Sequence, residues 1–387
     1  MIKVASLFTQ VLSLINRNDF ARAVHQCDAE HAAKGFRCWD QFVAMMFCQL
    51  GGADSLREIC GGLSTAMGKL VHLGLKNPPA RSTLSYTNTH RPWQLYQTVF
   101  YHLYRQAHTL ANQQQRRFRF KNHLFSIDSS TIDLCLSMYD WARFRQTKGA
   151  VKLHLQLHHQ GCLPCWALIT DGKTHDVKVA KSLKFEPGAI VVMDRAYVDY
   201  ALFGRWIEDG VWFVTRAKRN MQYRVLKNRP VSGRGNILKD QEIILTGYYA
   251  RQNCRHRLRR IVVWDSENER EILLLTNHME FSAGTISAIY KERWQIELFF
   301  KAIKQNLKIK TFVGTSENAV KIQIWTALLC MLVLKILQMR SRFSWSLSNL
   351  SAMLRFNLLT YRDLWVWLDQ PYQTPATGPP QAQLLLF

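Results

Sequence analysis

The middle of the chain limits the fold most, because its hydrophobic pattern changes there from alternating to continuous. Apolar and polar residues alternate in Leu124–Cys135 and in Val151–His158, and Cys165–Thr170 follows after a turn. Alternation predicts strands with one buried face, in an antiparallel meander. Gly188–Met193 is continuously apolar, as expected for a strand buried on both faces.

A helix and a further strand are predicted after this buried strand, at Asp199–Glu208 and Val211–Thr215. Three antiparallel strands followed by parallel strands with helices is the order of a ribonuclease-H-like sheet. We therefore expect a mixed α+β fold with a ribonuclease-H-like core.

Two acidic residues occupy distinctive positions in the predicted sheet. Asp128 follows the hydrophobic half of the first strand, and Asp194 ends the buried strand, where open α/β sheets bind their ligands. Each has a structural alternative: Asp128 could cap a Ser-rich turn, and Asp194 could pair with Arg195. The competing acids are Asp133, Asp171, Asp176 and Asp199.

The segment Tyr290–Lys304 predicts a helix with two distinct faces. One face carries the polar residues Tyr290, Arg293, Glu297, Lys301 and Lys304. The other carries the apolar residues Ile289, Ile296, Phe300, Ile303 and Leu307. The polar face could be a solvated row of ion pairs. A single carboxylate surrounded by cations also suits a metal ligand beside a phosphate chain.

The spacing Tyr-x2-Arg-x3-Glu-x6-Lys in this segment resembles the signature of the "YREK" (IS-four) group of insertion-sequence transposases, whose ribonuclease-H-like core carries a DDE triad. The sequences Asp128-Ser-Ser-Thr131 and Asp194-Arg-Ala-Tyr197 are similar to the first and second acidic motifs of that family. Gly172–Asp176 also resembles a family element, with no role that follows from the sequence. The resemblance extends from about residue 1 to residue 340.

The resemblance implies a role for each matched residue. Asp128, Asp194 and Glu297 would be the catalytic carboxylates and hold two Mg²⁺ ions, for which Mn²⁺ can substitute. The residues expected to contact DNA are Tyr290, Arg293, Lys301, Lys304 and Arg195.

The function implied is that of a DNA transposase. It would bind the terminal inverted repeats of an insertion sequence and catalyse metal-dependent cleavage and strand transfer by a cut-and-paste route. Its partners would be the double-stranded DNA of transposon ends and target, and a second copy of the chain in a synaptic homodimer. Its location would be the bacterial cytoplasm, at the nucleoid.

The charge of the chain supports a polyanionic partner. Lys and Arg number 51 against 28 Asp and Glu, which gives a net charge of +23. Nucleic acid is favoured over a membrane, because the charge is spread in clusters and the longest uncharged apolar run, Ile322–Leu334, has only 13 residues. That run predicts a buried helix.

The cysteines favour a reducing compartment, because there are nine of them, scattered along the chain. Cys162-x2-Cys165 has the spacing of zinc ligands, but it has no second Cys pair and spans a hairpin turn. We interpret the nearby His154 and His158 as strand residues on a polar face.

Five regions are predicted along the chain. Residues 1–115 form a helical DNA-binding domain, in which Arg81–Arg91 is rich in groups that reach phosphates and bases, although an ordinary helical cap domain is the alternative. Residues 116–217 begin the core with a basic aromatic linker, either a DNA contact or a solvated hinge. The other regions are a β-rich insertion at 218–280, the second part of the core at 281–340 and a helical tail with a disordered end at 341–387.

Four strands are predicted in the insertion: Gln222–Leu226, Glu242–Tyr248, Arg259–Trp264 and Glu271–Thr276. Arg255–Arg260 holds four Arg and one His and is expected to face DNA. One departure from some relatives concerns Ile272, which stands where they have a Trp that stacks on a flipped base. Trp264 or Tyr249 could replace it, or excision could proceed without a flipped base.

Three other functions compete with a transposase. A transposase-derived DNA-binding protein would carry a damaged triad, and Asp128, Asp194 and Glu297 are all present. A metal-dependent nuclease without strand transfer would have the same motifs. A tyrosine recombinase needs an Arg/His cluster around its nucleophile, whereas Tyr290 is better placed as a phosphate contact.

Overall fold

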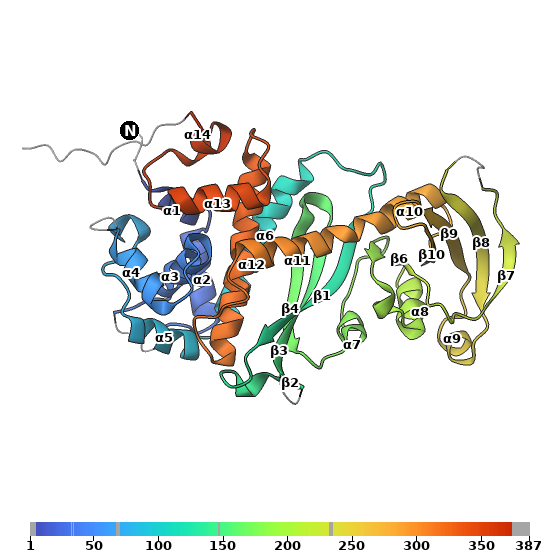
Figure 1. The fold of residues 1–387 in the computed structure, drawn as a ribbon, viewed down its shortest axis with the longest axis horizontal. Coiled ribbons are helices and arrows are strands. Elements are labelled where there is room, and N and C mark those ends of the chain that lie inside the picture. The colour runs from blue at the N-terminus through green and yellow to red at the C-terminus, as the bar shows by residue number, and fades with distance from the viewer. Residues whose placement is uncertain are drawn as a thin grey trace, which may run out of the picture. The chain divides into compact units, whose positions relative to one another are not determined.

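The computed structural model describes residues 5–373 except 32, 34, 67–69, 146–147 and 232–234. The chain forms two compact units, of which residues 115–131 and 151–299 make the sheet unit. The helical unit comprises residues 1–114, 132–150 and 300–387, as far as they are described. Three elements run from one unit into the other: β1 (Leu124–Leu134), β3 (Lys148–His158) and α11 (Trp294–Asn306). Figure 1 shows these elements along the chain.

The first half of the sheet confirms the strands predicted for the middle of the chain. Its remaining strands are β4 (Leu163–Asp171), β5 (Ile190–Val192) and β6 (Trp212–Arg216). They lie in the order β4-β3-β1-β5-β6, in which β3 and β4 are antiparallel and β1, β5 and β6 are parallel. The fold is therefore mixed α/β, as expected, with a large sheet.

The second half of the sheet is made by the predicted insertion. Its elements are β7 (Tyr223–Asn228), β8 (Ile237–Leu245), α9 (Tyr248–Asn253), β9 (Leu258–Asp265) and β10 (Arg270–Thr276). Because β10 pairs antiparallel with β6, these strands extend the sheet in the order β6-β10-β9-β8-β7. The four predicted strands are confirmed, but the strand expected to reach Tyr248 ends earlier. Tyr248 begins α9, where the Arg251 N–H binds the Gly247 carbonyl.

Helices cover both faces of the sheet unit. They are α7 (Asp176–Ala180), the 3-10 turn η4 (Arg195–Tyr197), α8 (Tyr200–Glu208) and α10 (Ala283–Glu292). Phe203 of α8 stacks on Phe213 of β6 at 4.1 Å on one face, and Ile289 of α10 packs in the core of the other. Val191 belongs to the first core and Val192 to the second. The strand β5 is therefore buried on both faces, as its continuous apolar sequence predicts.

The helical unit is built around α12 (Glu317–Arg340), which packs against α3, α5, α6 and α13. The other helices are α1 (Leu7–Leu12), α2 (Arg17–Gln26), α3 (Cys38–Gly51), α4 (Leu56–Ser64), α5 (Arg81–His90), α6 (Gln94–Asn112), α13 (Leu347–Asn357) and α14 (Leu364–Asp369). Short 3-10 turns occur at η1 (Leu70–Leu73), η2 (Asp140–Ala142) and η3 (Gln160–Cys162), the last in the sheet unit. The strand β2 (Arg143–Arg145) pairs with the first residues of β3.

By length and composition alone, α12 could cross a membrane, with a mean hydropathy of 1.9 over its most apolar window. However, 89% of that window is buried inside the protein. The buried side chain of Gln323 is fully hydrogen-bonded: its Nε2 donates to the carbonyls of Lys308 and Thr311, and its Oε1 accepts from the Val313 N–H. The helix is thus a core element, which confirms the buried helix predicted from Ile322–Leu334.

Candidate active site

The pairing of β1 with β5 brings two acidic residues to the same level of the sheet. Ser126 pairs with Val192, so Asp128 and Asp194, each two residues further along, lie at the same level of the sheet, Asp128 within β1 and Asp194 just past the carboxyl end of β5. Both side chains are half-buried. This is the edge at which open sheets of parallel strands bind ligands, as expected from the sequence.

Local hydrogen bonds hold each acid differently. Asp128 lies within β1 with Ser129, whose backbone N–H donates to Asp128 Oδ1 at 2.8 Å, so Asp128 does not cap a Ser-rich turn. Asp194 caps the turn η4, because its Oδ1 accepts from the Arg195 N–H at 2.6 Å. The Arg195 side chain is exposed.

The third acid, Glu297, joins this pair through Arg293. Arg293 Nη1 donates to Glu297 Oε1 at 2.7 Å. Burial, with smaller contributions from the charges of Glu297 and Asp194, raises the pKa of Asp128 to about 6, against the opposing effects of the Ser129 N–H and of Arg293. The three carboxylates therefore lie within electrostatic reach of one another, with the guanidinium among them.

The helix that carries Arg293 and Glu297 is not continuous, contrary to the sequence-based expectation for Tyr290–Lys304. α10 ends at Glu292 and α11 begins at Trp294. At the junction the Arg293 N–H binds the Tyr290 carbonyl three residues back, so the hydrogen-bond pattern tightens locally while Arg293 keeps helical dihedral angles. The predicted apolar stripe is buried: Ile289, Ile296, Phe300, Ile303 and Leu307 are each at most 6% exposed.

The residues expected to contact DNA divide between the two units. Tyr290 is buried in the sheet unit, and the Arg293 guanidinium lies 5.6 Å from the centre of its ring. Burial raises the pKa of Tyr290. Lys301 and Lys304 lie in the helical unit's part of α11, exposed and half-buried respectively. Burial and the nearby charge of Lys310 lower the pKa of Lys304.

Residues 119–333, more than half of the chain, match a family described as "Transposase DDE domain". The chain belongs to the DDE transposase family. A second match, to a domain of unknown function (DUF4372), covers residues 3–76.

Curated relatives of this family are named as transposases. The chain is 33% identical over 250 residues to a probable transposase for insertion sequence element IS5377 of Geobacillus stearothermophilus, which covers 63% of this chain and 65% of that protein. It is 30% identical over 306 residues to the putative transposase y4zB of Sinorhizobium fredii, covering 78% and 84% respectively. A putative transposase for insertion sequence element IS4SA of a Synechocystis strain is 29% identical, over 55% of this chain and 60% of that protein.

Among solved structures, a piggyBac transposase synaptic complex with hairpin DNA aligns with a TM-score of 0.40 and 9% identity, over 92% of this chain and 79% of that one. The sequence relationships, not this alignment, establish the family.

The acidic residues of this DDE transposase family member suit a hard divalent cation, because their donor atoms are carboxylate oxygens. Glu297 Oε2 is buried and has no hydrogen-bond partner among the described residues, so it has a free position for a ligand. In the described part of the chain, however, no three His, Cys, Asp or Glu side chains are close enough to hold a metal ion. The carboxylates interact electrostatically but would have to move closer together to share an ion.

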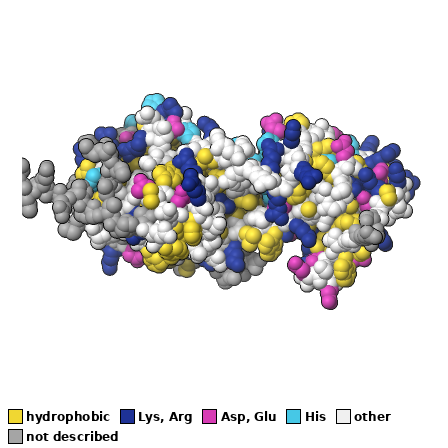
Figure 2. All heavy atoms as spheres, turned by 90° about the horizontal axis from the view of Figure 1, so that it is seen from above, with side chains coloured by type: hydrophobic (Ala, Val, Ile, Leu, Met, Phe, Trp, Pro, Cys, Tyr) yellow, Lys and Arg dark blue, Asp and Glu magenta, His cyan; other side chains and the backbone are white. Residues whose placement is uncertain are grey.

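One basic segment of the insertion cannot face DNA in full, contrary to expectation. Within Arg255–Arg260, Arg259 is 1% exposed, and its guanidinium binds Asp240. This pairing is not predictable from the spacing along the chain, because Asp240 lies on the neighbouring strand β8. Figure 2 shows Lys and Arg side chains gathered instead over the β7–β8 end of the sheet, where Arg224, Lys227 and Lys239 are exposed.

Two histidines of β3 lie on a polar face of the strand, and this face is buried. His154 and His158 are strand residues, as predicted, but each is only 2% exposed. Their face of β3 is polar and yet buried. His154 belongs to a group of side chains around Asp176 that the sequence did not assign to the site.

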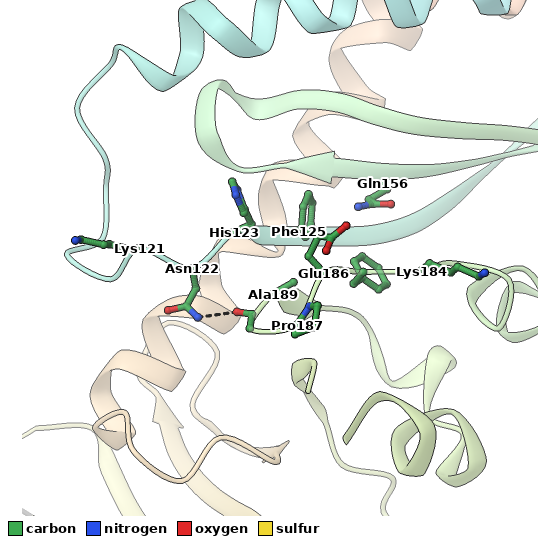
Figure 3. Close-up of a pocket in the computed structure, with 11 residues that line it drawn as sticks. Lys121, Asn122, His123, Phe125, Gln156, Lys184, Glu186, Pro187 and Ala189 are labelled. Atoms are coloured by element: carbon green, nitrogen blue, oxygen red, sulfur yellow. Dashed lines mark hydrogen bonds between the residues drawn. The ribbon is translucent and has the colours of Figure 1, made fainter. Parts of the chain in front are cut away.

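A cavity of about 410 Å³ in the sheet unit lies near the opposite end of β1, beyond the residue pair Leu124 and Ile190. Figure 3 shows its lining, in which the Asn122 side chain donates to the Gly188 carbonyl at 2.6 Å. The lining includes His123 and Glu186 but none of the three acids. This cavity is therefore separate from the candidate active site.

Proposed function

We propose that the chain is a DNA transposase of the YREK-signature group, which binds the terminal inverted repeats of an insertion sequence and moves the element by cut and paste. The observation that carries this proposal is the meeting of Asp128, Asp194 and Glu297 within electrostatic reach, with Arg293 bound to Glu297. The strand order β4-β3-β1-β5-β6 supports a ribonuclease-H-like core, because Asp128 lies on β1 and Asp194 follows the adjacent parallel strand β5.

Asp128, Asp194 and Glu297 would hold two Mg²⁺ ions, with Mn²⁺ as a working substitute. When bound, such ions activate a water or a 3′-hydroxyl and stabilise the leaving oxygen of the phosphodiester. The chain's own contribution is to collect three carboxylates on one edge and to keep one oxygen of Glu297 occupied by Arg293. That guanidinium moderates the repulsion between the acids before DNA arrives.

The basic residues around this edge would hold the phosphates of the DNA. Arg195 is exposed beside Asp194, and Arg293 has a buried Nε with no hydrogen-bond partner among the described residues, which a phosphate oxygen could accept from. Tyr290, Lys301 and Lys304 would complete the set of contacts. The net charge of +23 supports double-stranded DNA, both transposon ends and target, as the partner.

End recognition is assigned to residues 1–115 and to the insertion at 218–280. The helix α5 supports this, because Arg81 and Ser85 are exposed on it and the exposed ring of Tyr86 stacks on His90 at 4.1 Å. Such groups can reach phosphates and base edges. The active assembly would be a synaptic homodimer, in the bacterial cytoplasm at the nucleoid.

The test is cleavage of a linear duplex that carries the inverted repeats flanking the coding region, with and without Mg²⁺. Glu297→Gln keeps the shape of the side chain and removes the charge, so we expect cleavage to fall by more than about 100-fold, beyond the effect typical of a residue that only supports a metal ligand. The matched control is Glu186→Gln, an exposed acid near the opposite end of β1, which should cut like wild type.

Wild-type cutting by Glu297→Gln would remove the triad assignment. A band-shift assay separates the rivals: binding of the repeats without any cutting by the wild-type chain would indicate a DNA-binding protein derived from a transposase. Adding a target plasmid separates the nuclease alternative, because a nuclease would cut the ends without joining them to the plasmid.

A further inference from the structure

Asp176 has no role in the proposed catalytic set, yet three side chains converge on one of its oxygen atoms. Ser129 Oγ donates to Asp176 Oδ1 at 2.6 Å. Lys152 Nζ lies 3.3 Å from the same oxygen and His154 Nδ1 lies 3.5 Å from it. Because Ser129 directly follows Asp128, this carboxylate is tied to the backbone of a proposed metal ligand.

The partners of Asp176 are themselves fixed on the sheet. Lys152 and His154 stand at alternate positions of β3, and so on one face of it. Lys152 Nζ also donates to the Thr174 carbonyl at 2.9 Å, and His154 Nε2 bonds with Thr170 Oγ1 at 3.0 Å. Burial lowers the pKa of His154 to about 4, so Lys152 is the positively charged partner at neutral pH.

A second connection leads from Ser129 to the other aspartate. Tyr197 lies in η4, three residues after Asp194, and is 4% exposed. Burial raises the pKa of its phenol, the charges of Asp128, Asp176 and Asp194 add to this rise, and Ser129 opposes it, so the phenol lies beside this group of side chains. The Ser129 hydroxyl, which lies on the strand that carries Asp128 and is bound to Asp176, is therefore close to the Tyr197 side chain in the turn that follows Asp194.

We propose that Asp176 is a positioning residue, which through Ser129 and Tyr197 fixes the distance between Asp128 and Asp194 so that the two carboxylates can share divalent ions. This inference rests on the proposed function of that pair. Asp176 itself binds no ion in this scheme. Partners that orient metal ligands typically contribute 10- to 100-fold in metal affinity or activity.

A purely architectural role is the competing explanation. Asp176 begins α7, a helix of five residues, and its side chain is 27% exposed, so its loss removes no large apolar surface. The residues of α7 that enter the core are Val179 and Ala180, which do not depend on the carboxylate. Removal of the carboxylate should therefore alter ion binding more than folding.

The experiment measures Mn²⁺ binding to the full-length chain without DNA, by electron paramagnetic resonance, together with thermal unfolding. Asp176→Ala should bind Mn²⁺ about tenfold more weakly than wild type, with a similar unfolding temperature. Asp176→Asn keeps an oxygen that accepts from Ser129, so it should recover most of the loss. The half-maximal Mg²⁺ concentration for cleavage should rise in the same order.

The matched control is Asp171→Asn. Asp171 belongs to the same turn and accepts from the Thr174 N–H at 2.9 Å, but it is bound to neither Ser129 nor Tyr197 in the described contacts. Wild-type Mn²⁺ binding is expected for this variant. If Asp176→Ala does not fold, Ser129→Ala tests the same link from its other end.

Two outcomes separate this inference from the proposed function. If Asp128→Asn loses Mn²⁺ binding while Asp176→Ala and Ser129→Ala bind like wild type, the positioning role is wrong and the metal site stands. If Asp128→Asn binds like wild type, or the wild-type chain binds no Mn²⁺, the proposed metal site fails and the inference fails with it. A fall in ion binding that only follows a fall in unfolding temperature would favour the architectural role.

Discussion

Two groups of charged residues in the sheet unit, the Arg259–Asp240 pair and the candidate active site, are stabilised in opposite ways. In the insertion, Arg259 and Asp240 are 1% and 4% exposed and form a two-fold hydrogen bond, with Nε–Oδ1 at 2.8 Å and Nη2–Oδ2 at 2.6 Å. Arg259 Nη1 also donates to the carbonyls of His278 and Phe281. Every part of this guanidinium has a partner, so the pair joins β8 and β9 to the segment before α10.

At the candidate active site the charges are not matched in this way. Three acids share one guanidinium, and the pKa of Asp128 is raised to about 6 by burial and by the charges of Glu297 and Asp194. Glu297 Oε2 and Arg293 Nε have no hydrogen-bond partner among the described residues. The Arg259–Asp240 pair thus has all its hydrogen bonds within the protein, whereas Glu297 and Arg293 keep unpaired atoms where a ligand is expected. Perturbed acids of this kind mark functional sites more often than structural ones.

The largest predicted effect concerns the satisfied pair. Arg259→Ala would leave Asp240 buried without its partner and should lower the free energy of unfolding by about 3–5 kcal/mol. The measurement is urea unfolding, followed by hydrogen exchange in β8 and β9 because the chain has two units. Arg257→Ala, at an exposed position of the same segment, should change stability by less than about 0.5 kcal/mol.

Equal stability of these two variants would show that the Arg259–Asp240 pair is not a structural anchor. Retained Mn²⁺ binding in a folded Arg259→Ala protein would show that the two sites act independently.

Much of the fold could be predicted from periodicity alone. Alternation indicates a strand and which of its faces is buried, and β1, β3, β4 and the strands of the insertion follow it. Periodicity does not identify the neighbouring strand. A run of arginines therefore indicates an exposed DNA-binding surface, although Arg259 pairs with an aspartate on the adjacent strand. The helix break at Arg293 is not predictable from periodicity either, because Arg293 keeps helical dihedral angles and only the backbone hydrogen bonding changes.

Asp128 and Asp194 could be predicted as site residues, because the position of each along or just after its strand determines where it lies in the sheet. Asp128 and Asp194 stand at equal heights because they follow paired residues of two parallel strands, and Glu297 was placed by resemblance to a family. Asp176 was not assignable, because its importance comes from contacts with Ser129 on β1 and Lys152 on β3. The spacing of residues along the chain does not show which side chains of separate strands come into contact.

The raised pKa of Asp128 predicts that the stability of the protein depends on pH. The pKa of about 6 in the folded protein exceeds the ordinary value of 3.8, so the folded state holds this proton more tightly than the unfolded state does. Stability should therefore fall as pH rises from about 4 to above 6, by at most roughly 2–3 kcal/mol. Asp128→Asn cannot ionise, so its stability relative to wild type should increase over that range.

The measurement is urea unfolding of both proteins in EDTA at a series of pH values. Parallel pH profiles would show that the pKa of Asp128 is not raised in the metal-free folded protein. Asp128 would then be no less well stabilised than Asp240. Adding Mn²⁺ to wild type above pH 6 should recover the lost stability, because an ion that binds the folded state favours the ionised carboxylate.

The smallest predicted effect is that of Arg293→Ala. This variant tests whether the Arg293 guanidinium binds DNA or only stabilises the structure around Glu297. Arg293→Ala removes the donor to Glu297 and one proposed phosphate contact. The affinity for repeat-bearing DNA should fall, and the slope of log affinity against log salt should decrease by about 1, the change expected for one lost phosphate contact. Lys291→Ala, exposed two residues earlier on α10, is the matched control and should leave the slope unchanged.

An unchanged slope for Arg293→Ala, together with weaker Mn²⁺ binding, would mean that Arg293 serves Glu297 rather than DNA. Its position would then parallel that of Arg259 beside Asp240, and the unsatisfied Nε would no longer indicate a phosphate.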